Sequence, residues 1–154
     1  MKISPILLSA VIAWAIAQFL KILIAIFQQK KFDFKLMWAS GGMPSSHSAT
    51  VCAMTACCAY LEGFSSNAFA IACVFAFVVM YDAMGVRRAV GEQAKALNQI
   101  ILDIANSKPF AFENGLKVVM GHTPLQVLFG ALLGILVGCL FPWLLNIPSY
   151  IHAA

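Results

Sequence analysis

Residues 41–49 read GGMPSSHSA, and an apolar run begins directly behind them. The stretch places a proline, serine hydroxyls and one histidine, His47, at the start of the helix that the run predicts. A second histidine, His122, stands in GHTP at residues 121–124, again just before an apolar run. Two histidines in the same position before two apolar helices predict polar sites at the mouth of a helical bundle.

The composition indicates a membrane protein. The chain has 154 residues, of which 62% are hydrophobic and only 10% are charged, against about 25% charged residues in soluble domains. A soluble fold of this size cannot bury that much apolar surface. We therefore expect an all-α integral membrane bundle that forms one domain over residues 1–154. The chain has no basic tract interleaved with aromatic residues, so no nucleic-acid partner is expected.

Four runs are long or apolar enough to enter the bilayer, where a spanning helix needs about 20 residues. They cover residues 6–27, 48–61, 68–83 and 125–145. The second run is short, and we expect its helix to begin within residues 44–47, so that its polar end lines a cavity. The alternative for the first run is a cleaved signal peptide, but its apolar stretch is longer than a typical signal has.

Other patterns concern helix packing. Four apolar residues recur at helical spacing between the third and fourth runs: Leu97, Ile100, Ile101 and Ile104. They predict an amphipathic helix that either lies in the membrane interface or packs on the bundle. Glycines at positions 130, 134 and 138 permit close helix approach, within the bundle or between protomers of a homo-oligomer. The five cysteines lie inside apolar runs without zinc or disulfide spacing, so we expect buried hydrophobes.

The number of helices decides which polar groups share a membrane face. Four helices, with a tight turn at residues 62–67, bring the motif at 41–49, the pair Arg87 and Arg88, and His122 to one face. Basic residues concentrate on that face: Lys30, Lys31, Lys35, Arg87, Arg88, Lys95, Lys108 and Lys117. The opposite face has only Lys2. The positive-inside rule therefore predicts that the motif face is cytoplasmic and that both termini lie outside.

The residues of that face suit phosphate chemistry. Cleavage of a phosphate ester needs cations and N–H donors around the equatorial oxygens, a nucleophile in line, and an acid for the leaving oxygen. Histidine can act as nucleophile or acid, because its unperturbed pKa is about 6.5. Ser45 and Ser46 offer hydroxyls, and the first turn of the second helix offers backbone amides. Positive charge is available from Lys21, Arg87 and Arg88.

Three blocks of sequence carry a resemblance to a known family. PSSH at residues 44–47 resembles the Pro-Ser-Gly-His motif of the type 2 phosphatidic acid phosphatase (PAP2) superfamily, which also contains vanadate-dependent haloperoxidases. HTPLQVLFG at residues 122–130 resembles that family's final motif. Together with YDAMGVRRAVGEQAKALN at residues 81–98, these blocks resemble the divergent branch of small bacterial and plastid members.

The resemblance implies a phosphatase acting on a lipid phosphate or lipid pyrophosphate in a bacterial plasma membrane, without a metal or other cofactor. It implies that His122 attacks phosphorus to form a phosphohistidine and that His47 protonates the leaving oxygen. Ser45, Ser46 and Lys21 would cradle the phosphate, together with one of Arg87, Arg88 and Lys117. Phosphatidic acid, phosphatidylglycerophosphate and isoprenyl pyrophosphates all stay open as substrates.

The chain departs from the family pattern at two positions. The carboxylate four residues after the nucleophile is Gln126 here, which can orient a histidine but has no charge. Asp82 is the acid that could replace it. The arginine expected six residues before the nucleophile is Leu116. Gln126 motivates a second hypothesis, a non-catalytic lipid-phosphate-binding or regulatory protein that retains the pocket. A third hypothesis is a small carrier or scaffold that uses the glycine stripe.

Overall fold

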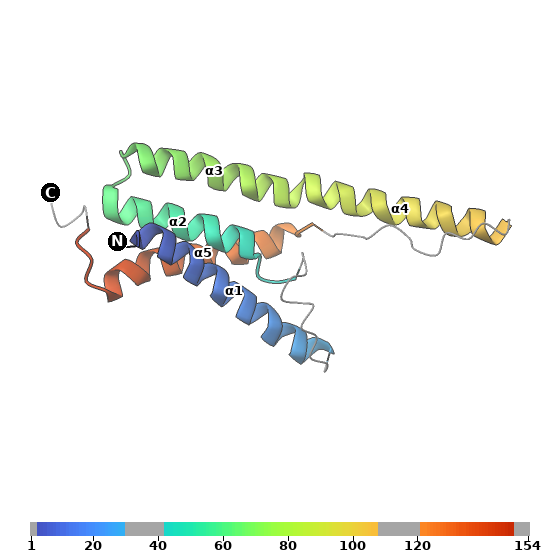
Figure 1. The fold of residues 1–154 in the computed structure, drawn as a ribbon, viewed down its shortest axis with the longest axis horizontal. Coiled ribbons are helices and arrows are strands. Elements are labelled where there is room, and N and C mark those ends of the chain that lie inside the picture. Colours follow the sequence, from blue (N-terminus) through green and yellow to red (C-terminus); the bar gives the residue numbers. More distant parts are fainter. Residues whose placement is uncertain (1–2, 30–41, 108–120, 150–154) are drawn as a thin grey trace.

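A computed structural model describes residues 3–29, 42–107 and 121–149, and within these ranges it contains helices and no strand. The helices are α1 (Pro5–Gln29), α2 (Ser46–Glu62), α3 (Asn67–Met84), α4 (Val86–Ser107) and α5 (Pro124–Leu144). Figure 1 shows α1, α2, α3 and α5 alternating in direction within one bundle, while α4 extends beyond the bundle as a continuation of α3. The prediction of an all-α bundle with an additional helix is confirmed.

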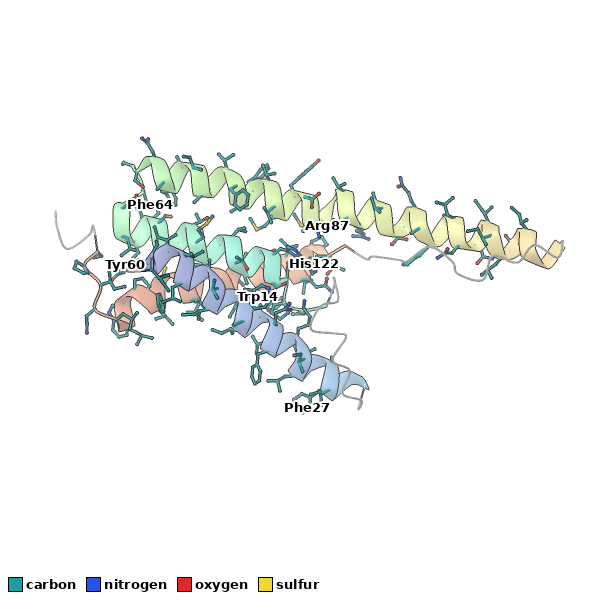
Figure 2. All side chains as sticks on the ribbon, in the orientation of Figure 1. Trp14, Phe27, Tyr60, Phe64, Arg87 and His122 are labelled. Atoms are coloured by element: carbon teal, nitrogen blue, oxygen red, sulfur yellow. The ribbon has the colours of Figure 1, made fainter. Side chains whose placement is uncertain are left out.

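Large apolar side chains cover the outside of this bundle (Figure 2). On α3, Ile71, Val74 and Phe77 are each more than half exposed. A soluble monomer rarely exposes so continuous an apolar surface. Among the described residues, three stretches are long and apolar enough to cross a membrane: α1 over Pro5–Phe27, α3 with α4 over Asn67–Ile104, and α5 over Pro124–Leu144. The chain is an integral membrane protein.

The shorter helix α2 occupies the centre of the bundle. It has 17 residues, or about 26 Å at 1.5 Å per residue, and it contacts α1, α3 and α5. It begins at Ser46, inside the window expected from the sequence. Ser46 and Ser48 in its first turn are buried, so the polar end of α2 is shielded from lipid by its neighbours.

Three glycines allow α5 to lie directly on α2. An added Cβ would collide with a backbone carbonyl oxygen at each of them: Gly130 with that of Ser45, the cap of α2, Gly134 with that of Ala49, and Gly138 with that of Ala53. Both helices therefore present small residues at every fourth position, and their backbones approach closely. The glycine stripe packs inside the bundle, so a homo-oligomer would need a different surface.

Helix caps explain why the predicted bounds agree with the structure to within two residues. Ser45, Ser66 and Thr123 precede α2, α3 and α5, and each side-chain oxygen accepts a hydrogen bond from the backbone N–H three residues later. These bonds satisfy amides that have no partner inside the helix.

Helix α4 contains the predicted amphipathic stretch. It begins at Val86, before that stretch and directly after α3 in the sequence. Among the described helices it contacts α3 alone, so the alternative in which it packs on the bundle is not seen in these residues. Its location in the membrane interface stays a prediction. Several basic residues used for orientation lie outside the described residues: Lys2, Lys30, Lys31, Lys35, Lys108 and Lys117. The orientation in the membrane therefore stays a prediction. Leu116, which occupies the position of the family arginine, also lies outside the described residues.

Candidate functional site

The two histidines meet at the end of the bundle where α2 and α5 begin. The ring centroids of His47 and His122 lie 5.8 Å apart, edge to face. Two backbone hydrogen bonds hold this arrangement. The N–H of Ser45 donates to the carbonyl of Gln126, and the N–H of His122 donates to the carbonyl of Ala83, both at 3.0 Å. The loop before α2 is thereby tied to α5, and the start of α5 is tied to the end of α3.

Gln126 orients the ring of His122. Its Oε1 accepts a hydrogen bond from the backbone N–H of Thr123 at 3.0 Å and lies 3.3 Å from Nδ1 of His122. The Thr123 bond identifies the atom facing His122 as the amide oxygen, which can only accept. Nδ1 must then carry the proton, so Nε2 of the neutral ring keeps its lone pair. The glutamine thus favours the tautomer in which Nε2 carries no proton.

The surroundings of His122 favour its neutral form. Burial lowers its pKa, and the hydrogen bond to Gln126 raises it. The charges of His47, Lys21 and Arg87 lower it further. A buried ring with a depressed pKa is unprotonated near neutral pH, which is the state in which an imidazole can attack.

His47 is half-buried in the first turn of α2, opposite His122. Its Nδ1 is buried and has no hydrogen-bond partner within the part of the chain that the structure describes. A buried polar atom without a partner costs free energy. The described residues thus leave Nδ1 of His47 available for a partner that the structure does not contain.

Lys21 is buried in α1, with only 4% of the residue exposed. Its stem runs beside Gly42, because a Cβ built on that glycine would lie 3.2 Å from the lysine Cγ. The lysine charge acts on both histidines. A buried ammonium is costly unless an anion compensates it, so Lys21 makes this end of the bundle favourable for an anion.

Arg87 and Arg88 differ in their contacts. Nε of Arg87 pairs with Oδ2 of Asp82 at 2.8 Å, and both side chains are partly exposed. This ion pair gives Asp82 a structural partner on the exposed side of the bundle end. The charge of Arg87 acts on both histidines, while the side chain of Arg88 is exposed on α4. Gly121 lies against the backbone that joins Arg87 to Arg88, so the start of α4 supports the loop carrying His122.

The serines of the motif stabilise the start of α2. Oγ of Ser45 accepts from the backbone N–H of Ser48 at 3.4 Å and from the Ser48 hydroxyl at 3.1 Å. Ser45 and Ser46 are both buried beside the histidines. Ser45 therefore caps α2, and the contact of Ser45 and Ser46 with phosphate stays a prediction. Ser48 was not among the predicted site residues, although it belongs to the same motif.

One signal for the role of Gln126 was present in the sequence. Thr123-Pro-Leu-Gln126 has the form of a capping box, and the structure contains both of its reciprocal hydrogen bonds.

Among the described residues, no group of three histidine, cysteine, aspartate or glutamate side chains is arranged to hold a metal ion.

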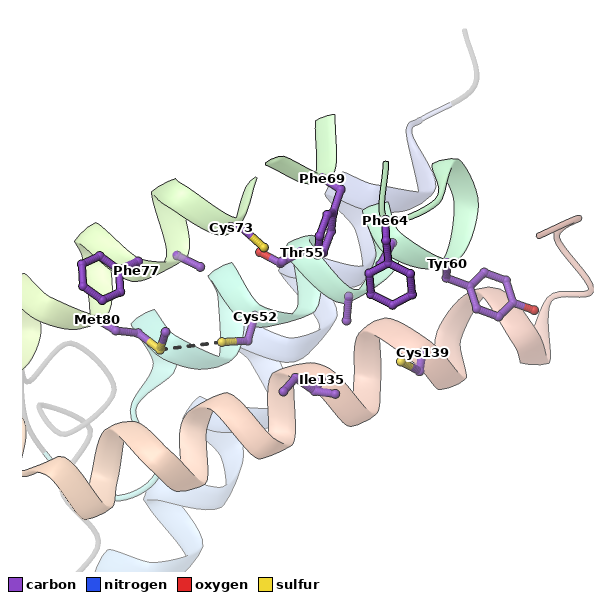
Figure 3. A pocket seen from close by; sticks show the side chains of 13 residues that line it. Cys52, Thr55, Tyr60, Phe64, Phe69, Cys73, Phe77, Met80, Ile135 and Cys139 are labelled. Carbon is purple, nitrogen blue, oxygen red and sulfur yellow. Dashed lines mark hydrogen bonds between the residues drawn. The ribbon is translucent and has the colours of Figure 1, made fainter. Parts of the chain in front are cut away.

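One cavity lies away from the histidines. It measures about 460 Å³ and lies between α2, α3 and α5, lined by apolar and sulfur-containing side chains such as Phe69, Met80 and Cys139 (Figure 3). Its Cys52 thiol contacts the Met80 sulfur at 3.8 Å. The lining carries no histidine, lysine or arginine, so it lacks groups that would hold a phosphate.

Comparison with known proteins agrees with this description. The model of the divergent PAP2 family matches residues 3–137, a range that contains Lys21, His47, Arg87, His122 and Gln126. The chain is also 41% identical over 141 residues to a Bacillus subtilis (strain 168) protein named uncharacterized membrane protein YuiD. The aligned region covers 85% of this chain and 89% of that protein. No solved structure matches the chain.

Proposed function

This chain belongs to the divergent PAP2 family, and we propose that it is a membrane phosphatase that hydrolyses a lipid phosphate or lipid pyrophosphate. The observation that carries the proposal is the pairing of His122 and His47, whose ring centroids are 5.8 Å apart. One ring has its tautomer set by Gln126, and the other has a buried nitrogen without a partner among the described residues. Such a pair supplies the nucleophile and the acid that phosphate transfer needs.

The proposed first step forms a covalent intermediate. Nε2 of His122 attacks phosphorus, and the bond from phosphorus to the lipid oxygen breaks. His47 gives its proton to that oxygen, so the lipid leaves as an alcohol or as a lipid monophosphate. The phosphorylated ring is positively charged and keeps its Nδ1–H directed at Gln126. The negative charge of the bound phosphate favours the protonated form of His47 before the transfer.

The second step returns the enzyme to its starting state. His47, now neutral, takes a proton from a water molecule as that water attacks phosphorus. The bond from phosphorus to Nε2 breaks, and inorganic phosphate leaves. Lys21 and Arg87 stabilise the charge on the phosphoryl oxygens in both steps, together with amides in the first turn of α2. We place the site on the cytoplasmic side of a bacterial plasma membrane, following the predicted charge distribution.

Phosphate release by the purified protein tests the proposal. The protein would be assayed in a chelator against phosphatidic acid, phosphatidylglycerophosphate and an isoprenyl pyrophosphate. We expect release from at least one lipid, abolished in His122→Ala and strongly reduced in His47→Ala. An acid-labile, base-stable phosphoprotein should be trapped by rapid quenching of the wild type and be absent from His122→Ala. His152→Ala removes the third histidine of the chain and is the matched control. Equal release by wild type and a His47/His122 double variant would refute the proposal.

A second candidate function follows from the neutral Gln126. With an amide rather than a carboxylate at position 126, the positive ring of the intermediate is less stabilised than in a triad with an acid. The chain would then bind a lipid phosphate without turning it over. This alternative predicts saturable binding, no trapped phosphohistidine, and phosphate release that appears only in Gln126→Asp. Robust turnover by the wild type excludes it.

A further inference from the structure

A second, smaller cavity of about 330 Å³ opens between α1 and α5, and its lining is apolar. Leu20 and Ile24 form the α1 side, and Phe129, Leu132 and Leu136 form much of the α5 side. We call this cavity the α1–α5 groove. It is the cavity that adjoins the histidine site, because the motif loop closes one part of it.

Met43 and Pro44 line the groove and directly precede Ser45, the cap of the helix that carries His47. On α1, Leu20 lines the groove and the next residue is the buried Lys21, whose stem runs beside Gly42. The groove and the cationic site therefore share both the motif loop and one turn of α1.

Helix α5 connects the groove to the site along one face. Gln126, Phe129 and Leu133 are spaced at i, i+3 and i+7, and such positions lie on one side of a helix. Phe129 and Leu133 line the groove, while Gln126 orients His122. The face that positions the nucleophile at the polar end thus continues into the apolar groove further along α5.

We propose that the α1–α5 groove binds a hydrocarbon chain of the same substrate molecule whose phosphate lies at His122 and His47. This assignment rests on the proposed function and adds that the protein recognises its substrate by the chain as well as by the phosphate. A cation at one end and an uninterrupted apolar lining beyond it match a lipid phosphate, in which a charged group is joined to a hydrocarbon chain. A groove of this size is at the lower limit of small-molecule pockets, so a hydrocarbon chain fits it and a helix of a partner protein does not.

Filling the groove tests the assignment. Leu132→Trp places a bulky ring in the groove, and Leu128→Trp is its matched control. The two leucines are almost equally exposed, at 55% and 56%, and Leu128 is one turn nearer to the histidines but does not line the groove. Both variants would be compared with wild type in amphipol, on dioctanoyl phosphatidic acid and on para-nitrophenyl phosphate, which has no hydrocarbon chain.

We expect Leu132→Trp to lower kcat/KM for the lipid by about tenfold or more, since each methylene left in water costs about fourfold. Turnover of para-nitrophenyl phosphate by the same variant should stay within about twofold of wild type, because the phosphate site is unchanged. Leu128→Trp, the control, should leave kcat/KM for both substrates unchanged. Equal lipid kcat/KM in Leu132→Trp and Leu128→Trp would overturn the assignment.

A binding measurement keeps the groove testable if the wild type turns over neither substrate, the result that would refute the proposed function. Phosphatidic acid with a diazirine in its acyl chain would be photolysed with the protein in vesicles, and the labelled peptides identified. We expect label on α5 at residues 129–136 and on α1 at residues 20–24, decreased in Leu132→Trp but not in Leu128→Trp. Label spread evenly over the exposed face of α3 would show ordinary contact with lipid and would overturn the assignment.

Discussion

Replacing Gln126 with glutamate adds a negative charge beside His122 without changing the length of the side chain. In the wild type, Oε1 of Gln126 lies 3.3 Å from Nδ1 of His122 and also accepts the Thr123 N–H. A glutamate oxygen can accept both hydrogen bonds, so the tautomer of His122 should be preserved. The substitution therefore isolates the effect of charge from the effect of orientation.

The expected magnitude follows from this separation. Opposite unit charges about 4 Å apart attract by about 4 kcal/mol at an effective dielectric constant of about 20, and by about 1 kcal/mol in water. One pKa unit corresponds to about 1.4 kcal/mol. The pKa of His122 should therefore rise by roughly one to three units in Gln126→Glu.

The sign of the effect on activity depends on pH. In the proposed mechanism the neutral ring of His122 is the nucleophile, so kcat/KM should fall as the pH decreases through the pKa of His122. Burial lowers that pKa in the wild type, which should place the acid limb below about pH 6.5. In Gln126→Glu the limb should move to higher pH. On its alkaline side the rate should exceed that of the wild type by about tenfold or more, because the carboxylate stabilises the positively charged ring.

Phosphate release measured from pH 5 to 9 provides the assay, with the pKa of His122 followed by NMR of labelled histidine. Gln93→Glu, on an exposed part of α4, adds the same charge elsewhere and should leave the limb in place. It also controls for titration of the substrate phosphate, which is common to all variants. An acid limb and a plateau rate identical to those of wild type would refute the role assigned to Gln126.

Further variants separate binding, charge and packing. Lys21→Met keeps the stem and removes the ammonium, and it should raise KM by about tenfold or more, since a hydrogen bond to a charged group contributes about 1.5–3 kcal/mol. Arg87→Leu should lower kcat/KM by about tenfold, and Arg88→Leu by about twofold or less, because the charge of Arg87 acts on both histidines. Gly134→Leu should reduce the free energy of unfolding by about 1–3 kcal/mol and lower kcat, because it forces α5 away from α2. Thermal unfolding in detergent measures that loss.

Matched changes accompany these variants. Lys21→Arg keeps the charge and should restore part of the lost affinity, and an unchanged KM in Lys21→Met would assign that lysine a structural role. A larger loss in Arg88→Leu than in Arg87→Leu would reverse the assignment of the arginines. Ala70→Leu enlarges an exposed position on α3 and should leave stability unchanged. If Gly134→Leu is as stable as Ala70→Leu, the close contact at Gly134 is not needed for the stability of the bundle.

The helix positions were predictable because local signals mark them. Apolar runs indicate where the helices lie, and the residues at Ser45, Ser66 and Thr123 are of the types that cap helix starts. The continuation of α3 into α4 was less visible, since Gly85 and the change to polar residues suggest an interruption. In the structure only Gly85 separates the two helices.

The arrangement of the site depended on contacts between distant segments. Periodicity placed glycines along α5, but their partners on α2 are ordinary small residues that no pattern marks as a contact surface. The burial of Lys21 likewise depends on its position beside Gly42, a contact between α1 and the motif loop that spacing does not reveal. The distance between the two histidines follows from both contacts.

Helix α5 has two faces with different contacts. Gly130, Gly134 and Gly138 face α2 and keep His122 near His47, while Leu132 and Leu136 line the α1–α5 groove on another side of the same helix. We therefore expect a change at a glycine to alter the distance between the two histidines, and a change at Leu132 or Leu136 to alter the shape of the groove. In the proposed enzyme, directed evolution toward a new lipid would therefore vary Leu132 and Leu136 and keep the three glycines, so that lipid selectivity changes while the histidine pair is retained.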